Sequence, residues 1–150
     1  MSFKGLAWIA AFTLVGGLVF AFTLRYFQRP PQGPVEPAWN RQVCAHCGMI
    51  LDNRFFAGQI QAHGGEIYFF DDPGCLIAFQ DQKKPDARAI YLHHHLREAW
   101  LAWPKLGFVP AVSPMGFGLG CVGEGEAGAK ALEWARARVK AGLLKQGVKQ

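Results

Sequence analysis

The first apolar run of the chain extends for twenty residues without a charge, Gly5–Leu24. A helix rises about 1.5 Å per residue, so roughly 20 such residues cross a bilayer core. A cleaved signal peptide is the alternative, but the run is long for the apolar region of one, and no A-x-A cleavage site follows it. The pattern therefore predicts a transmembrane anchor over residues 1–27. Lys4 precedes the run, and Arg25 and Arg29 follow it, so charge does not decide the orientation.

Prolines dominate the next segment, whose sequence from Arg29 to Asn40 is RPPQGPVEPAWN. Proline disfavours helix interiors and central strands, and runs of it favour an extended polyproline II conformation. We therefore expect residues 28–42 to be a semi-rigid linker. The remaining residues, 43–150, are enough for one hydrophobic core and are predicted to form the folded domain.

A partly alternating apolar pattern predicts the first strands of this domain. Phe55–His63 and Glu66–Phe70 are rich in strand-forming residues, and Gly64-Gly65 between them is a two-residue hairpin signal. Asp71-Asp72-Pro73 then indicates the start of a helix, with a capping aspartate and proline at the first position. Ala89–His93 is the next predicted strand. The order of these elements is ββαβ.

The second half of the domain has shorter strand signals and one long helix. Strands are predicted at Trp100–Trp103, Gly107–Val112 and Leu119–Val122, with the loop SPMGFG before the last of them. From Glu126 to Leu144, apolar residues recur at helical spacing and predict an amphipathic helix. The whole pattern indicates an α+β domain.

The formal net charge is +5, and much of the excess lies between Lys130 and Lys149. A basic helix could contact nucleic acid or anionic lipid. Glutamates near its start and basic residues near its end also complement the helix dipole, so we interpret it as a solvated face and expect no nucleic-acid partner. The chain has no glycine-rich phosphate loop, no G-x-S-x-G elbow and no H-E-x-x-H motif. We therefore expect no enzymatic activity.

The strongest chemical signal is the C-x-x-C motif of Cys44 and Cys47. The two cysteines could form a structural disulfide, act as a redox dithiol or supply half of a metal site. A thioredoxin-type dithiol lies between a strand and a helix, whereas this pair follows a proline-rich segment. Cys75 and Cys121 are isolated cysteines, and the sequence alone does not show whether either forms a disulfide.

Two methionines change the balance among these alternatives. Met49 directly follows Cys47-Gly48, and Met115 lies in a loop between Pro114 and Gly116. Each could simply pack in the core. Thioether sulfur is also a good ligand for Cu(I) and a poor one for zinc, calcium or magnesium. The candidate ligands are therefore Cys44, Cys47, Met49 and Met115, with His46 as an accessory ligand because it lies between the two cysteines.

Other polar residues give weaker functional signals. Asp71 and Asp72 are read as helix-capping residues that could support a metal ligand from outside the ligand set. His93 and His95 would share one face of a strand and His94 the other, and imidazole suits copper and zinc. Adjacent histidines at a strand end are more often surface residues, and their role stays open.

The motifs in this order resemble the NosL family, extracytoplasmic copper-binding proteins associated with maturation of nitrous oxide reductase. The resemblance covers about residues 43–144. It rests on five segments: CAHCGM at 44–49, FAGQI at 56–60, YFFDDPGCLIAF at 68–79, AIYLHHH at 89–95 and SPMGFGL at 113–119. The first half also resembles YHS/TRASH-type metal-binding modules. Typical NosL proteins are lipoproteins, whereas this chain has a predicted helical anchor.

The resemblance implies a fold of two ββαβ units and the binding of Cu(I) for delivery, without catalysis. Together with the anchor predicted over residues 1–27, it indicates a domain held at the cell membrane by a single span, on the periplasmic or outer surface. Its partners would be a copper transporter or a copper-accepting enzyme, nitrous oxide reductase or a related oxidase. The alternatives are an anchored thiol–disulfide oxidoreductase that uses Cys44 and Cys47, and a zinc-binding assembly module.

Overall fold

The computed structural model describes residues 3–27 and 29–147, and its contacts divide the chain into two units, residues 1–33 and 34–150. The first unit contains helix α1, Phe3–Phe27, so the helix expected from the apolar run is present. Among the described residues, no helix combines the length and the apolar character needed to cross a membrane. Residues 1, 2 and 28 of the predicted anchor and linker lie outside the described part of the chain.

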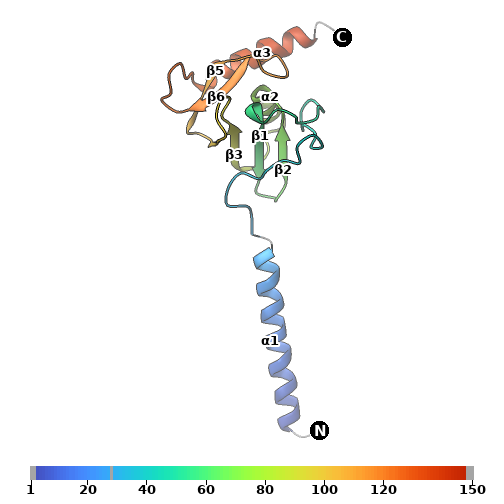
Figure 1. The fold of residues 1–150 in the computed structure, drawn as a ribbon. Coiled ribbons are helices and arrows are strands. Elements are labelled where there is room, and N and C mark those ends of the chain that lie inside the picture. The colour runs from blue at the N-terminus through green and yellow to red at the C-terminus, as the bar shows by residue number, and fades with distance from the viewer. Residues whose placement is uncertain (1–2, 28, 148–150) are drawn as a thin grey trace. The chain divides into compact units, whose positions relative to one another are not determined.

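The second unit, shown in Figure 1, is an α+β domain, as predicted. One antiparallel sheet has the strand order β2-β1-β3-β4, and β5 and β6 form a separate antiparallel pair. Helix α2 contacts β1, β2, β6 and helix α3. The elements in chain order are η1 (Arg54–Phe56), β1 (Gly58–Ala62), β2 (Ile67–Phe70), α2 (Pro73–Lys83), β3 (Ala87–His93), β4 (Trp100–Ala102), β5 (Leu106–Pro110), β6 (Leu119–Gly123) and α3 (Leu132–Gly147).

The ββαβ order of the first half is confirmed. The turn between β1 and β2 is closed by the amide of Ala62, which donates to the Glu66 carbonyl at 2.9 Å, and Gly65 takes a positive φ of 97°. Strand β1 begins later than predicted, because the preceding residues form the 3₁₀ turn η1. The side chain of Asn53 caps this turn by accepting from the Phe55 amide at 3.1 Å.

The second half differs from the expected ββαβ unit. Strand β4 pairs with β3, with Leu101 opposite Leu92, and so it extends the first sheet. The hairpin β5–β6 leads into α3, and no strand follows α3 within residues 29–147. This half is therefore a ββα arrangement. Helix α3 begins at Leu132 instead of Glu126, because tight turns with positive φ at Gly125 and Gly128 occupy the start of the predicted helix.

Part of the predicted linker belongs to the folded domain. The Gln59 side chain on β1 accepts from the Val35 amide at 2.9 Å and donates to the Val35 carbonyl at 2.8 Å. Gln59 is fully buried, so these two bonds satisfy an amide group that would otherwise be costly to bury. Ordered packing in the second unit therefore begins near Pro34, before the predicted domain boundary at residue 43.

The hydrophobic core lies between α2 and the first sheet and continues to the hairpin and α3. Its fully buried side chains include Ile60, Phe70, Leu76, Leu92 and Phe108. Burial of side chains of this size contributes about 1.5–3 kcal/mol each. The core also contains three cysteines, Cys44, Cys75 and Cys121. The first two fix the backbone on either side of the candidate site.

Candidate metal centre

The C-x-x-C motif forms a closed turn at the edge of the core. The Cys44 amide donates to the Met49 carbonyl at 2.7 Å, and the Gly48 amide donates to the Cys44 carbonyl at 3.1 Å. An isolated bridge between Val43 and Ile50 closes the ends. Gly48 has a φ of 78°, in the left-handed region that glycine adopts without steric cost. The glycine in CAHCGM thus has a structural role in turning the chain back.

Backbone amides of this turn point at the two sulfurs. The Cys47 amide donates to the Cys44 sulfur, and the Met49 amide donates to the Cys47 sulfur. Hydrogen bonds of this kind favour the charged thiolate and lower a thiol's pKa. The turn therefore holds both sulfurs in fixed positions, with part of the stabilisation that a thiolate requires.

Helix α2 brings a third sulfur and a carboxylate to the same place. Asp72 caps the helix by accepting from the Gly74 amide at 2.7 Å, and Cys75 lies in the first helical turn. The ligand atoms of Cys44, Cys47, Asp71 and Cys75 all lie within 4.8 Å of one another. We refer to these four residues as the Cys–Asp cluster. None of the four cysteines of the chain forms a disulfide, including Cys121, which lies outside the cluster.

The cluster lowers the pKa of one of its cysteines and raises the pKa of the other two. Cys75 donates a hydrogen bond to the Cys44 sulfur, and this bond is the largest cause that lowers the pKa of Cys44 to about 7. Burial raises the pKa of Cys47 to about 12, while donation to Cys44 and burial raise the pKa of Cys75. Above about pH 7, the metal-free cluster therefore holds one thiolate, on Cys44, with thiols on Cys47 and Cys75. Binding of a metal by all three releases two further protons.

Asp71 supplies the clearest sign that the cluster accommodates a cation. Its side chain is only 3 % exposed. Oδ1 accepts from the Cys47 thiol at 3.3 Å, but Oδ2 is buried and makes no hydrogen bond within the described residues. A buried carboxylate oxygen without a partner is costly, and an ion is one of the few groups that can satisfy it. Three sulfurs and a carboxylate are therefore a donor set that fits a thiophilic metal.

Of the five ligands predicted from the sequence, Cys44 and Cys47 belong to the cluster. His46 is not among the cysteine, histidine and carboxylate residues whose ligand atoms lie within 4.8 Å of one another. The two methionines stay predicted ligands, and the backbone of each is held near the cluster. Met49 is 48 % exposed and takes part in the closed turn through its backbone. Met115 packs against the core, and its amide donates to Asp72 at 2.9 Å. Burial lowers the pKa of His46 below its ordinary value, and the nearby Asp71 carboxylate offsets part of this effect.

Sequence reasoning missed Cys75 and gave Asp71 only a supporting role. The signal was present in the order of residues DDPGC. A capping aspartate followed by proline fixes the first turn of the helix, which fixes the position of Cys75, and Asp71 precedes the cap. What the sequence could not show is that β1 and β2 bring this helix end beside the C-x-x-C turn. The structure supplies that contact: the Ala45 amide donates to the Phe69 carbonyl at 2.8 Å.

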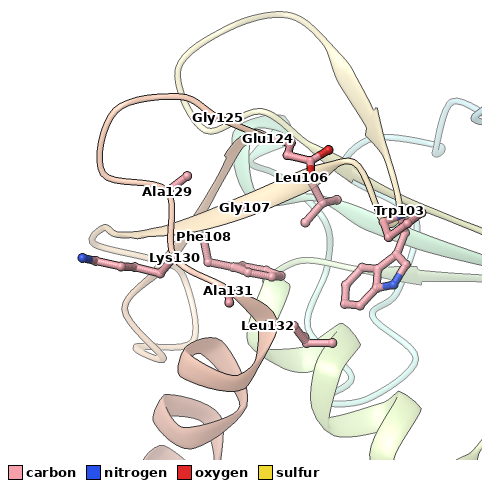
Figure 2. A pocket seen from close by; sticks show the side chains of 11 residues that line it. Trp103, Leu106, Gly107, Phe108, Glu124, Gly125, Ala129, Lys130, Ala131 and Leu132 are labelled. Atoms are coloured by element: carbon pink, nitrogen blue, oxygen red, sulfur yellow. The ribbon is translucent and has the colours of Figure 1, made fainter.

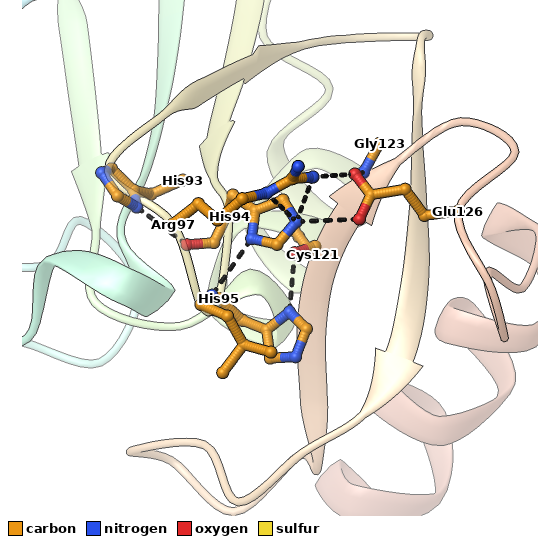
Figure 3. Close-up of polar contacts among 8 residues, drawn as sticks. His93, His94, His95, Arg97, Cys121, Gly123 and Glu126 are labelled. Atoms are coloured by element: carbon orange, nitrogen blue, oxygen red, sulfur yellow. Dashed lines mark hydrogen bonds and ion pairs between the residues drawn. The ribbon is translucent and has the colours of Figure 1, made fainter.

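The three histidines form a different polar group, shown in Figure 3. The prediction that they lie on the surface is wrong for His93 and His94, which are 4 % and 2 % exposed. His94 Nε2 lies 3.2 Å from a carboxylate oxygen of Glu126, and Arg97 contacts the same carboxylate. The His95 Nδ1 atom lies 3.0 Å from the Cys121 carbonyl. These contacts connect the loop after β3 to β6 and to the turn before α3, and none of the histidines joins the Cys–Asp cluster.

A cavity of about 350 Å³ lies elsewhere in the domain, between β5 and the segment that leads into α3 (Figure 2). Its apolar side chains include Trp103, Phe108 and Leu132, and Glu124 and Lys130 also line it. None of the four cluster residues contributes to its wall. This cavity is thus separate from the group of residues that can bind a metal.

Comparison of the chain with protein-family models, with curated proteins and with solved structures finds no match. The resemblance to the NosL family therefore stays an expectation drawn from the sequence motifs.

Proposed function

We propose that this protein is a membrane-anchored Cu(I)-binding chaperone without catalytic activity. The single observation that carries the proposal is the convergence of three cysteine sulfurs and one carboxylate within 4.8 Å. Cu(I) prefers thiolate and thioether ligands in low coordination numbers, so three sulfurs are sufficient to hold it. Met115, Met49 and His46 are additional candidates that can exchange with the ligands of a partner.

The location and the partner belong to the same proposal. The uncharged run of Gly5–Leu24 would anchor the chain by a single span, with the folded domain on the extracytoplasmic side. Anchoring would raise the concentration of the domain near a membrane copper transporter or a copper-accepting enzyme. The resemblance to NosL favours nitrous oxide reductase or a related oxidase as the acceptor.

The exposure of the ligands supports transfer of the ion over permanent storage. Cys44, Asp71 and Cys75 are buried, whereas Cys47 is only partly buried. An acceptor could therefore attack the ion from the side of Cys47, and the ion would leave the inner sulfurs last.

The test is an anaerobic titration of the reduced full-length chain in detergent with Cu(I) against a competing chelator. The proposal predicts one tightly bound Cu(I) per chain, with affinity reduced by Cys47→Ser and by Cys75→Ser. Cys121→Ser is the matched control, because this cysteine is buried but lies outside the cluster. Unchanged affinity in both cluster variants would refute the assignment.

Zinc is a second candidate because Asp71 adds an oxygen ligand to the three sulfurs. Zinc is commonly bound by four ligands drawn from cysteine, histidine and carboxylate. The same titration run with Zn²⁺ separates the two metals. Binding of Zn²⁺ in preference to Cu(I), with dependence on Asp71, would support a zinc-binding assembly module instead.

A thiol–disulfide oxidoreductase is the remaining alternative, and the lowered pKa of Cys44 favours it. A thiolate beside a second thiol can attack a disulfide substrate and then be resolved by that thiol. Reduction of a disulfide substrate by the metal-free chain, unaffected by added Cu(I), would support this function. Under the copper proposal, Cu(I) blocks any such reaction because it occupies the same sulfurs.

A further inference from the structure

Asp72 is buried at the point where helix α2 meets the loop that contains Met115. It is 0 % exposed, and both of its carboxylate oxygens accept backbone hydrogen bonds. Oδ1 accepts from the Gly74 amide at 2.7 Å and Oδ2 accepts from the Met115 amide at 2.9 Å. One side chain therefore fixes the first turn of the helix and the position of Met115 together.

The loop is held at further points on either side of Met115. The Ser113 hydroxyl hydrogen-bonds to Asp72 and accepts from the Gly118 amide at 3.1 Å. The Phe117 ring packs so closely on α2 that a Cβ added at Gly74 would lie 2.3 Å from it. Its other edge faces Gly142 of helix α3, where an added Cβ would lie at 2.8 Å. The backbone of the loop thus has a defined position relative to α2.

That position places Met115 beside the Cys–Asp cluster. Asp72 directly follows the cluster residue Asp71, and Cys75 lies in the helical turn that Asp72 caps. Met115 and Cys47 are both partly buried and pack against the same core. A methionine side chain has three rotatable bonds, so a thioether anchored here by its backbone can reach toward the sulfurs.

We propose that Asp72 is a positioning residue that directs the Met115 thioether to a copper ion in the cluster and so favours Cu(I) over Zn²⁺. The inference rests on the proposed function and adds the origin of its metal preference. A thioether stabilises Cu(I) but contributes little to a zinc site. A residue that controls whether Met115 reaches the ion therefore changes the affinity for Cu(I) and leaves the affinity for Zn²⁺ unchanged.

Asp72→Asn separates this role from helix capping. Asparagine is a favoured N-cap residue, but its single carbonyl oxygen can occupy only one of the two positions that Oδ1 and Oδ2 take in Asp72. With that oxygen at the position of Oδ1, it accepts from Gly74 but does not reach the Met115 amide. The NH2 group that replaces Oδ2 is a hydrogen-bond donor, so it cannot accept from the Met115 amide. The helix start is retained, while the hydrogen bond to the loop is lost.

The experiment is a double-mutant cycle on the reduced full-length chain in detergent, with Cu(I) and Zn²⁺ affinities measured by chelator competition. We expect Asp72→Asn and Met115→Leu each to weaken Cu(I) binding roughly 10- to 100-fold, and the double variant to be no weaker than Met115→Leu alone. Zn²⁺ affinity should be unchanged in all three. Ser113→Ala, which leaves the cap of α2 in place, should weaken Cu(I) binding in the same direction and also lose its effect when Met115 is leucine.

The outcomes distinguish the inference from the function on which it rests. Additive losses in the double variant, or equal losses for Cu(I) and Zn²⁺, would overturn the positioning role, because a general weakening of the fold affects both metals. Wild-type Cu(I) affinity in Asp72→Asn and Ser113→Ala would overturn it as well. Absence of Cu(I) binding by the wild-type chain would instead refute the proposed function.

Discussion

Replacing Cys75 with alanine removes the S–H donor that stabilises the Cys44 thiolate. This hydrogen bond is the largest cause of the lowered pKa of Cys44, and burial acts in the opposite direction. Without the bond, only the backbone amides of Cys47 and Asp71 oppose burial and the Asp71 side chain, both of which raise the pKa of Cys44. We therefore predict that the pKa of Cys44 rises from about 7 toward its ordinary value of 9.0.

The size of the effect is large at a pH slightly above neutral. At about pH 7.5, a thiol with a pKa of about 7 is about three-quarters thiolate, whereas a thiol with a pKa of 9.0 is only about 3 % thiolate. The pKa values of Cys47, Cys75 and Cys121 are all raised, so these thiols contribute almost no thiolate there. The variant should therefore lose most of the thiolate of the metal-free chain.

The assay is a pH titration of thiolate absorbance in the far ultraviolet, with the chain reduced and metal-free. Cys75→Ser should give an intermediate result, because the serine hydroxyl can still donate to the Cys44 sulfur. Cys121→Ala is the control and should titrate like the wild type, because Cys121 lies outside the cluster. A wild-type titration in Cys75→Ala would refute the proposed hydrogen bond and the single-thiolate description of the cluster.

Three further predictions concern packing and proton release. Gly74→Ala should destabilise the domain by about 1–3 kcal/mol in denaturant unfolding, because the added Cβ would overlap the Phe117 ring. Gly33→Ala is the control and should have little effect, because a Cβ added there meets no atom within 4 Å. Phe70→Ala should cost about 3–5 kcal/mol in the same assay, because Phe70 is fully buried; a cost below 1 kcal/mol would contradict the assigned core. Above the pKa of Cys44, binding of Cu(I) by the three sulfurs releases two protons, so the binding constant should rise about 100-fold per pH unit. Below that pKa, binding releases three protons, so the rise should be about 1,000-fold per pH unit. A pH-independent constant in chelator competition would contradict thiol ligation.

Local signals were sufficient to predict the first half of the fold. The Gly64-Gly65 turn and the Asp72-Pro73 helix start each depend on neighbouring residues, so the hairpin and α2 could be read from short stretches of sequence. The second half depends on pairing between distant residues. Nothing in the short segment Trp100–Ala102 indicates that it pairs with β3 instead of opening a second unit.

The candidate site was predicted in part for the same reason. Cys44 and Cys47 are close in sequence, and their spacing alone indicated a shared site. Cys75 and Asp71 join them only because β1 and β2 return the chain to the C-x-x-C turn before α2 begins. A contact of this kind depends on strand register, which single residues do not encode.

The most direct test of the account is X-ray absorption spectroscopy of the Cu(I)-loaded, reduced full-length chain, compared with its Cys75→Ser variant. We predict a copper ion surrounded mainly by sulfur, with the sulfur of Cys75 lost from the first coordination shell in the variant. A wild-type ion bound mainly by nitrogen and oxygen, or a coordination shell that Cys75→Ser leaves unchanged, would contradict the assignment of the cluster as the copper site.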